Sequence, residues 1–221
     1  MKSLISISVF FILANLNAQR IKPFLGAAIL FNSEYERSSI LNLNGGIEFK
    51  VNHYFKPEIE AGFYFGAIKE TTEGNDQGFT TTIYERGITA LTLSFLPKII
   101  FNSHKTEEEG IGYFQIFPAY TISRVAARGN YIVVNQNNFA QSTEEKETIS
   151  VIHHSFGIGL GFYINLSENN LNALAVNVVY QPIDFGKSIA QLKYYKNTQF
   201  NTKDQVGLGV KFYFGRKHKE K

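Results

Sequence analysis

The sequence predicts an all-β chain that forms a closed, antiparallel, up-and-down transmembrane β-barrel of about eight strands. The stretch Val206–Phe214 alternates apolar residues with small or polar ones, so an extended strand there has one apolar, aromatic-ended side. The chain opens on an export-type segment, and after it no apolar run is long enough for a transmembrane helix. A closed barrel pairs a final strand of this kind with the first strand and removes both exposed edges.

The composition suits strands and narrows the chemistry. Of the 221 residues, 20 are Phe, 12 are Tyr and 18 are Gly, whereas Cys is absent. Aromatic side chains favour packed strand faces, and the absence of Cys excludes disulfides, Cys-ligated zinc and thiol catalysis. The formal net charge of +3 is too small to indicate a nucleic-acid partner. We predict no cofactor and no metal site.

The chain divides into three parts. Residues 1–18 have the features of a secretory signal, with Lys2 as the positive start, Leu4–Leu13 as the apolar core and the expected cleavage site before Gln19. Residues 19–214 form the predicted barrel, and residues 215–221 form a basic C-terminal tail. An uncleaved anchor helix is the alternative for residues 1–18, but the apolar run is shorter than the roughly 20 residues that a span requires.

Eight segments alternate well enough to be strands, and Leu41–Val51 is the clearest of them. They are Ile21–Phe31, Leu41–Val51, Glu58–Lys69, Ile83–Phe101, Ile111–Arg124, Ile149–Asn165, Asn172–Gln181 and Val206–Phe214. An N-terminus on the periplasmic side would place four connections outside the cell: Asn32–Ser39, Glu70–Thr82, Ala126–Thr148 and Asp184–Lys203. The fifth segment has a mixed pattern; we place Tyr113 and Gln115 inside, although the reverse phase is open. The segment Tyr131–Val134 can extend a hairpin beyond the bilayer.

The polar faces of these strands define the predicted lumen. A soluble sandwich would bury the apolar faces against a second sheet, whereas a membrane barrel exposes them to lipid and turns the polar faces inward. The residues predicted to line the lumen are Asn42, Asn44, Glu48, Lys50, Glu58, Glu60, Tyr64, Arg86, Lys98, Gln115 and Lys211. Side chains fill the interior of an eight-stranded barrel, so these charges form either a buried ionic plug or, alternatively, a selective conduit.

Three features give the chain a family resemblance. The signal ends Asn17-Ala18-Gln19, the segment Leu91–Phe101 carries Lys98 after Pro97, and the last strand ends Phe212-Tyr213-Phe214. In these features, and in the order of its strands, the chain resembles small outer-membrane β-barrel proteins of Bacteroidetes-type bacteria, the porin-family or outer-membrane-barrel-domain proteins. That resemblance implies a Gram-negative outer-membrane location and insertion by the barrel-assembly machinery; it does not imply one biochemical activity.

One constellation could carry catalysis. Some eight-stranded outer-membrane barrels are lipid A deacylases with a His-x-Ser pair, and His153 and Ser155 match that spacing on one strand face. The match ends there, because Phe156 stands where that family has Asn and no acidic third member is evident. We therefore expect a structural, adhesive or weakly pore-forming role with specificity in the outside loops. The alternatives are a lipid A-modifying hydrolase and an accessory barrel of a secretion system. The expected partners are outer-membrane lipid and lipopolysaccharide.

Overall fold

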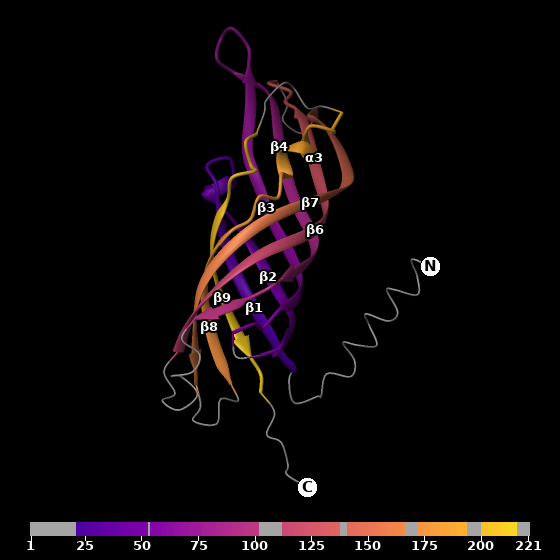
Figure 1. Ribbon diagram of the computed structural model, residues 1–221. Helices are drawn as coiled ribbons and strands as arrows, with labels where there is room; N and C mark the ends of the chain where they lie inside the picture. Colours follow the sequence, from indigo (N-terminus) through magenta and orange to yellow (C-terminus); the bar gives the residue numbers. More distant parts are fainter. Residues whose placement is uncertain are drawn as a thin grey trace, which may run out of the picture.

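The computed structural model describes residues 21–52, 54–101, 112–137, 141–166, 172–193 and 200–215 (Figure 1). The expected signal peptide and most of the basic tail lie outside these ranges. The strands are β1 Ile21–Phe31, β2 Ser39–Phe49, β3 Glu58–Gly74, β4 Thr80–Leu96, β5 Ile99–Phe101, β6 Gly112–Val133, β7 Thr143–Asn165, β8 Ala173–Tyr180 and β9 Val206–Tyr213. Two short helices accompany them, η2 Glu36–Ser38 and α3 Phe185–Ile189.

The strands close into a ring, which confirms the predicted fold class. The hydrogen-bonded order is β4-β3-β2-β1-β9-β8-β7-β6-β5, and β4 also pairs with β6. All pairings are antiparallel, and the first and last strands meet from Phe24 opposite Tyr213 to Phe31 opposite Val206. Strand β5 continues β4 after an interruption at Pro97, which has no N–H to donate, so the ring has eight members.

The outside of the ring is apolar and the inside is polar or aromatic. On β9, Val206, Leu208 and Val210 are 46 to 55% exposed, whereas Lys211 and Tyr213 are buried. The same alternation holds in β6, where Tyr113 and Gln115 are buried and Phe114 is exposed, so the predicted phase of that strand is confirmed. No second layer of described residues covers the apolar faces. Lipid is the solvent that such an outer surface fits, because every strand already pairs on both sides.

Two of the predicted outside loops are largely strand instead. The predictions for Glu70–Thr82 and Ala126–Thr148 were wrong in this respect: β3 and β4 pair up to Gly74 and Thr80, and β6 and β7 pair up to Val133 and Thr143. Both hairpins extend past the apolar belt as polar ribbons, and the β3–β4 hairpin projects farthest in Figure 1. A ribbon beyond the belt has no lipid-facing side and needs no apolar alternation, so the periodicity that marks the other strands is missing there.

No helix in the described ranges has the length and apolar character required to cross a bilayer.

An arginine placed in the middle of the apolar belt should be costly. We expect Val210→Arg to lower the free energy of unfolding in lipid by about 2 to 4 kcal/mol, because the charge would lie at the bilayer midplane. Phe79, 55% exposed near the tip of the β3–β4 hairpin, provides the control. Phe79→Arg should change stability by less than about 0.5 kcal/mol. Urea titration in vesicles, followed by circular dichroism, measures both variants; equal costs would contradict a lipid-facing β9.

Candidate functional site

The terminal end of the barrel, where β1 begins and β9 ends, is filled by an ionic cluster. The Glu58 carboxylate accepts hydrogen bonds from Lys98 Nζ at 2.5 Å, Lys211 Nζ at 2.8 Å and Tyr213 Oη at 2.6 Å. Lys98 also pairs with Glu48, and Lys211 pairs with Glu60 at 2.6 Å. Four segments of the chain meet here, namely β2, β3, the link between β4 and β5, and β9, and every charge has an opposite partner, as burial requires.

Aromatic rings in contact with one another complete this layer. The Tyr113 and Tyr163 rings lie 4.5 Å apart, and the Tyr163 and Tyr213 rings lie 5.0 Å apart. Lys98 Nζ lies 4.9 Å from the centre of the Tyr213 ring, so its cation also faces an aromatic surface. At the turn between β2 and β3, Lys56 Nζ donates to Tyr113 Oη at 2.9 Å. Burial lowers the pKa of Lys56 to about 8. The ionic and aromatic side chains together block the lumen.

The middle of the lumen is polar and partly hydrogen-bonded. Gln115 Nε2 donates to Asn177 Oδ1 at 2.8 Å. The Oδ1 atoms of Asn42 and Asn44 are buried and accept no hydrogen bond from the described residues. Both asparagines line a small cavity with Glu60. Glu60 and Lys211 of the ionic cluster form part of its wall.

A folded-back segment closes the hairpin end of the lumen. Asp184 Oδ1 caps α3 by accepting from the Lys187 N–H at 3.0 Å. Phe185 and Ile189 of α3 are 0% exposed and pack inside the ring. The prediction that Asp184–Lys203 projects as an outside loop is wrong for this buried part. Helix α3 is too short to show a 3.6-residue period in the sequence. The apolar residues spaced among the polar residues of this segment were the only sign that part of it is buried.

Two tyrosines fasten this segment, which we call the plug (residues 181–193 and 200–205). Tyr35 Oη donates to Gln205 Oε1 at 2.7 Å, and Tyr64 Oη donates to Gln181 Oε1 at 2.6 Å. Burial, together with the nearby Asp184 carboxylate, raises the pKa of Tyr35 and keeps its hydroxyl a proton donor. The plug is therefore anchored to the barrel wall by hydrogen bonds as well as by apolar packing.

The fold gives His153 a partner that its sequence spacing did not predict. His153 Nε2 lies 2.7 Å from Ser188 Oγ on α3. Ser155 is 6% exposed, and its Oγ has no hydrogen-bond partner among the described residues. Ser188 is 0% exposed, so neither serine is placed to meet a lipid ester. The contact instead holds α3 against β7.

The predicted lumen residues occupy the following positions. Asn44 and Lys50 are half-buried. The others are buried inside the ring: Asn42, Glu48, Glu58, Glu60, Tyr64, Arg86, Lys98, Gln115 and Lys211. Tyr163, Tyr213 and Lys56 are also buried in the lumen but were not among the predicted lumen residues. The strand phase could have indicated the two tyrosines, since both share a face with inward glycines; nothing in the turn sequence marked Lys56.

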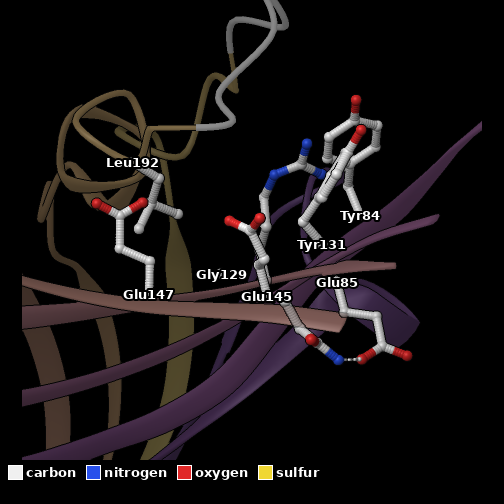
Figure 2. Close-up of a pocket in the computed structure, with 9 residues that line it drawn as sticks. Tyr84, Glu85, Gly129, Tyr131, Glu145, Glu147 and Leu192 are labelled. Atoms are coloured by element: carbon white, nitrogen blue, oxygen red, sulfur yellow. Dashed lines mark hydrogen bonds between the residues drawn. The ribbon is translucent and has the colours of Figure 1, made fainter. Parts of the chain in front are cut away.

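An open pocket lies above the plug, on the inner side of the ribbons (Figure 2). We call it the vestibule; its inner wall is formed by Tyr84, Arg86, Gly129, Tyr131, Glu145, Glu147 and Leu192. Tyr84 and Tyr131 lie side by side with ring centres 5.1 Å apart, and Leu192 stands beside Glu147 on the opposite side. Arg86 Nη1 donates to Thr71 Oγ1 at 2.8 Å, and Glu147 accepts from the Lys193 N–H at 2.6 Å. No group of described His, Cys, Asp or Glu side chains could hold a metal ion.

Comparisons with known proteins find structural neighbours only. No family model matches the chain, and no curated protein matches it in sequence. Neisserial surface protein A is 10% identical, with 89% of this chain and 97% of that chain covered and a TM-score of 0.49. A major outer membrane protein from Thermus thermophilus is 18% identical, with 88% and 99% covered and a TM-score of 0.45. The attachment invasion locus protein Ail of Yersinia pestis is 11% identical, with 88% and 97% covered and a TM-score of 0.40.

These structural similarities are too distant to indicate an activity. The assignment to a membrane location therefore depends on the architecture and surface of the barrel itself. The ring is closed, its outside is an apolar belt, and its inside is ionic and polar. Closed antiparallel barrels with this surface belong to outer membranes. The chain is a small outer-membrane β-barrel whose lumen is filled at one end and plugged at the other.

Proposed function

We propose that the protein is a non-conducting surface protein of the outer membrane, in which the barrel is an anchor and the hairpin end presents a binding surface. The observation that carries this proposal is the double closure of the lumen. The Glu58 ionic cluster fills one end, and the plug fills the other with Phe185 and Ile189. A weak pore would need a continuous polar path, whereas buried described side chains occupy the lumen near both of its ends.

The vestibule is the binding surface that we propose. It combines two tyrosine rings with the carboxylates of Glu145 and Glu147 at the hairpin end, which we propose faces the outside of the cell. Tyrosine faces pack against apolar surfaces of a ligand, and carboxylates accept hydrogen bonds from hydroxyl groups. This combination suits a saccharide, so we propose an adhesive role towards surface glycans.

The proposal also includes a family and a route of membrane insertion for the barrel. A place among the Bacteroidetes-type barrels is supported by the strand order and by the ending Phe212-Tyr213-Phe214. Insertion by the barrel-assembly machinery is expected for an outer-membrane barrel of this kind. No observation favours a secretion-system role. The buried His153–Ser188 contact does not favour a hydrolase.

Two measurements test the proposal. Purified protein in planar bilayers should give no current above the detergent control; stable single-channel steps would contradict the non-conducting barrel. On a glycan array, Tyr131→Ala should reduce binding about tenfold, because an aromatic contact at the centre of a small interface is lost. Tyr54→Ala, which removes an exposed tyrosine from the opposite turn, should leave binding unchanged. Wild-type protein that binds no saccharide would contradict the adhesive role.

A further inference from the structure

The upper edge of the apolar belt carries two outward arginines on one strand. On the outer face of β6, the residues run through Tyr120 and Ile122, and then reach Arg124 and Arg128. Both arginines are exposed, and within the described ranges neither side chain forms an ion pair or a hydrogen bond. Because they are four residues apart on an extended strand, their Cα atoms lie roughly 13 Å apart.

The neighbours of Arg124 on the adjacent strands are apolar and exposed, as expected on a lipid-facing surface. It pairs with Leu91 on β4 and with Ile152 on β7, which are 59% and 65% exposed. Below this row, Phe156 is 75% exposed on the same outer face of β7. The Arg124 guanidinium group therefore has apolar, lipid-facing side chains on both sides and below it. It can reach a polar environment only by extending upwards towards the lipid headgroup layer.

Between the two arginines, small side chains leave a shallow depression in the outer surface of the barrel. The row between them consists of Thr89, Ala126 and Ser150, which are all small. Beside Arg128 lies a groove that includes Gly87 and Lys146. A Cβ atom added at Gly87 would meet nothing closer than Arg128 Cβ at 3.9 Å, so the outer surface is hollow here. A headgroup with sugar-sized bulk can lie flat between the cations.

The nearby carboxylates form no ion pair with the two arginines in the described part of the chain. Glu85, which lines the same groove as Arg128, keeps its negative charge and accepts a hydrogen bond from the neutral amide of Asn130 at 2.9 Å, and Glu144 pairs with Lys146 at 3.0 Å. Lys146 is thereby partly neutralised, whereas the charges of Arg124 and Arg128 remain available. The chemistry that matches unpaired guanidinium groups above an apolar surface is a phosphate group with attached acyl chains.

We propose that Arg124 and Arg128 bind the phosphate groups of lipopolysaccharide in the outer leaflet, while its acyl chains pack on Leu91, Ile152 and Phe156. This inference assumes the outer-membrane orientation of the proposed function, with the hairpin end outside. It is independent of whether the vestibule binds a saccharide and of whether the lumen conducts.

The test compares lipopolysaccharide that carries its lipid A phosphates with the same material after dephosphorylation. Each is titrated against the purified full-length barrel in detergent. Wild-type protein should bind the phosphorylated form about 30-fold more tightly, because each arginine near the headgroup layer contributes about a factor of five. Arg124→Gln/Arg128→Gln should lose this preference. Lys69→Gln/Lys187→Gln removes the same charge elsewhere at the hairpin end and should keep it.

Other outcomes would overturn the proposal. These are an equal affinity of wild type for both forms, a preference that persists in the double arginine variant, or complete competition by inorganic phosphate. Heat-modifiable migration on gels verifies that each variant is folded. Planar-bilayer current and glycan binding are measured on the same samples, so failure of the proposed function and failure of the lipid site are distinguishable.

Discussion

Glu58→Leu is expected to lower the free energy of unfolding by about 3 to 5 kcal/mol, because it removes the carboxylate that two buried ammonium groups share. Lys98 and Lys211 both donate to Glu58, at 2.5 and 2.8 Å, and Tyr213 donates at 2.6 Å. Without this carboxylate, two cations and a hydroxyl compete for the remaining carboxylates of Glu48 and Glu60. The loss should appear as a lower urea midpoint of the barrel folded in vesicles.

Two control variants separate the charge from the side chain's bulk. Glu58→Gln keeps the shape and one acceptor oxygen, and its cost should therefore lie between those of wild type and Glu58→Leu. Glu70→Leu removes an exposed carboxylate from β3, and we expect a change within about 0.5 kcal/mol. If Glu58→Leu were as stable as Glu70→Leu, the ionic cluster would not be a stabilising element of the lumen.

Removing the plug is expected to open the hairpin half of the lumen without creating a pore. Tyr180 pairs with Val206, so residues 181–205 can be replaced by Asn-Gly, which forms a two-residue hairpin between β8 and β9. The deletion removes α3 from the ring but leaves the strand pairing and the Glu58 cluster intact. Water should then reach inward side chains such as Ser123, which is 0% exposed in the intact protein.

A single cysteine reports this opening, because the chain has no native Cys. In the intact barrel, Ser123→Cys should be inert to a membrane-impermeant thiol reagent; in the deletion variant it should react about 100-fold faster or more, since burial controls access. Thr80→Cys, exposed at the start of β4, should react equally in both. Single-channel current should stay at the detergent level in both proteins. A current in the deletion variant would show that the ionic and aromatic layer is no barrier.

The strands of the barrel wall were predictable because each has lipid on one side and the barrel interior on the other. These two environments require apolar residues to alternate with small, polar or aromatic ones. In β9, lipid requires Val206, Leu208 and Val210 on one side, and the crowded interior requires glycine, Lys211 and Tyr213 on the other. The ribbon parts of β3, β4, β6 and β7 lie beyond the apolar belt (Figure 1), so no lipid-facing side requires apolar residues there. They lack that pattern and were predicted as loops.

The partners inside the lumen could not be predicted in the same way. The sequence placed Glu58, Lys98 and Lys211 on inward faces, but it did not give the register that brings Lys211 within hydrogen-bond distance of a residue 153 positions away. His153 shows the same limit, because its contact is with Ser188 of a helix too short to detect. Side-chain pairing depends on ring closure, which no local pattern encodes.

Ring closure is tested most directly by a disulfide between the first and last strands. Ala28 pairs with Gly209, and a Cβ atom at Gly209 would lie 3.2 Å from Ala28 Cβ, near the roughly 3.5 to 4.5 Å typical of disulfides. Ala28→Cys/Gly209→Cys, folded in vesicles and mildly oxidised, should form an intramolecular cross-link in most molecules. Ala28→Cys/Gly207→Cys, one inward residue out of register, should not. Cross-links that form only between molecules, or mainly in the out-of-register variant, would contradict the closed barrel.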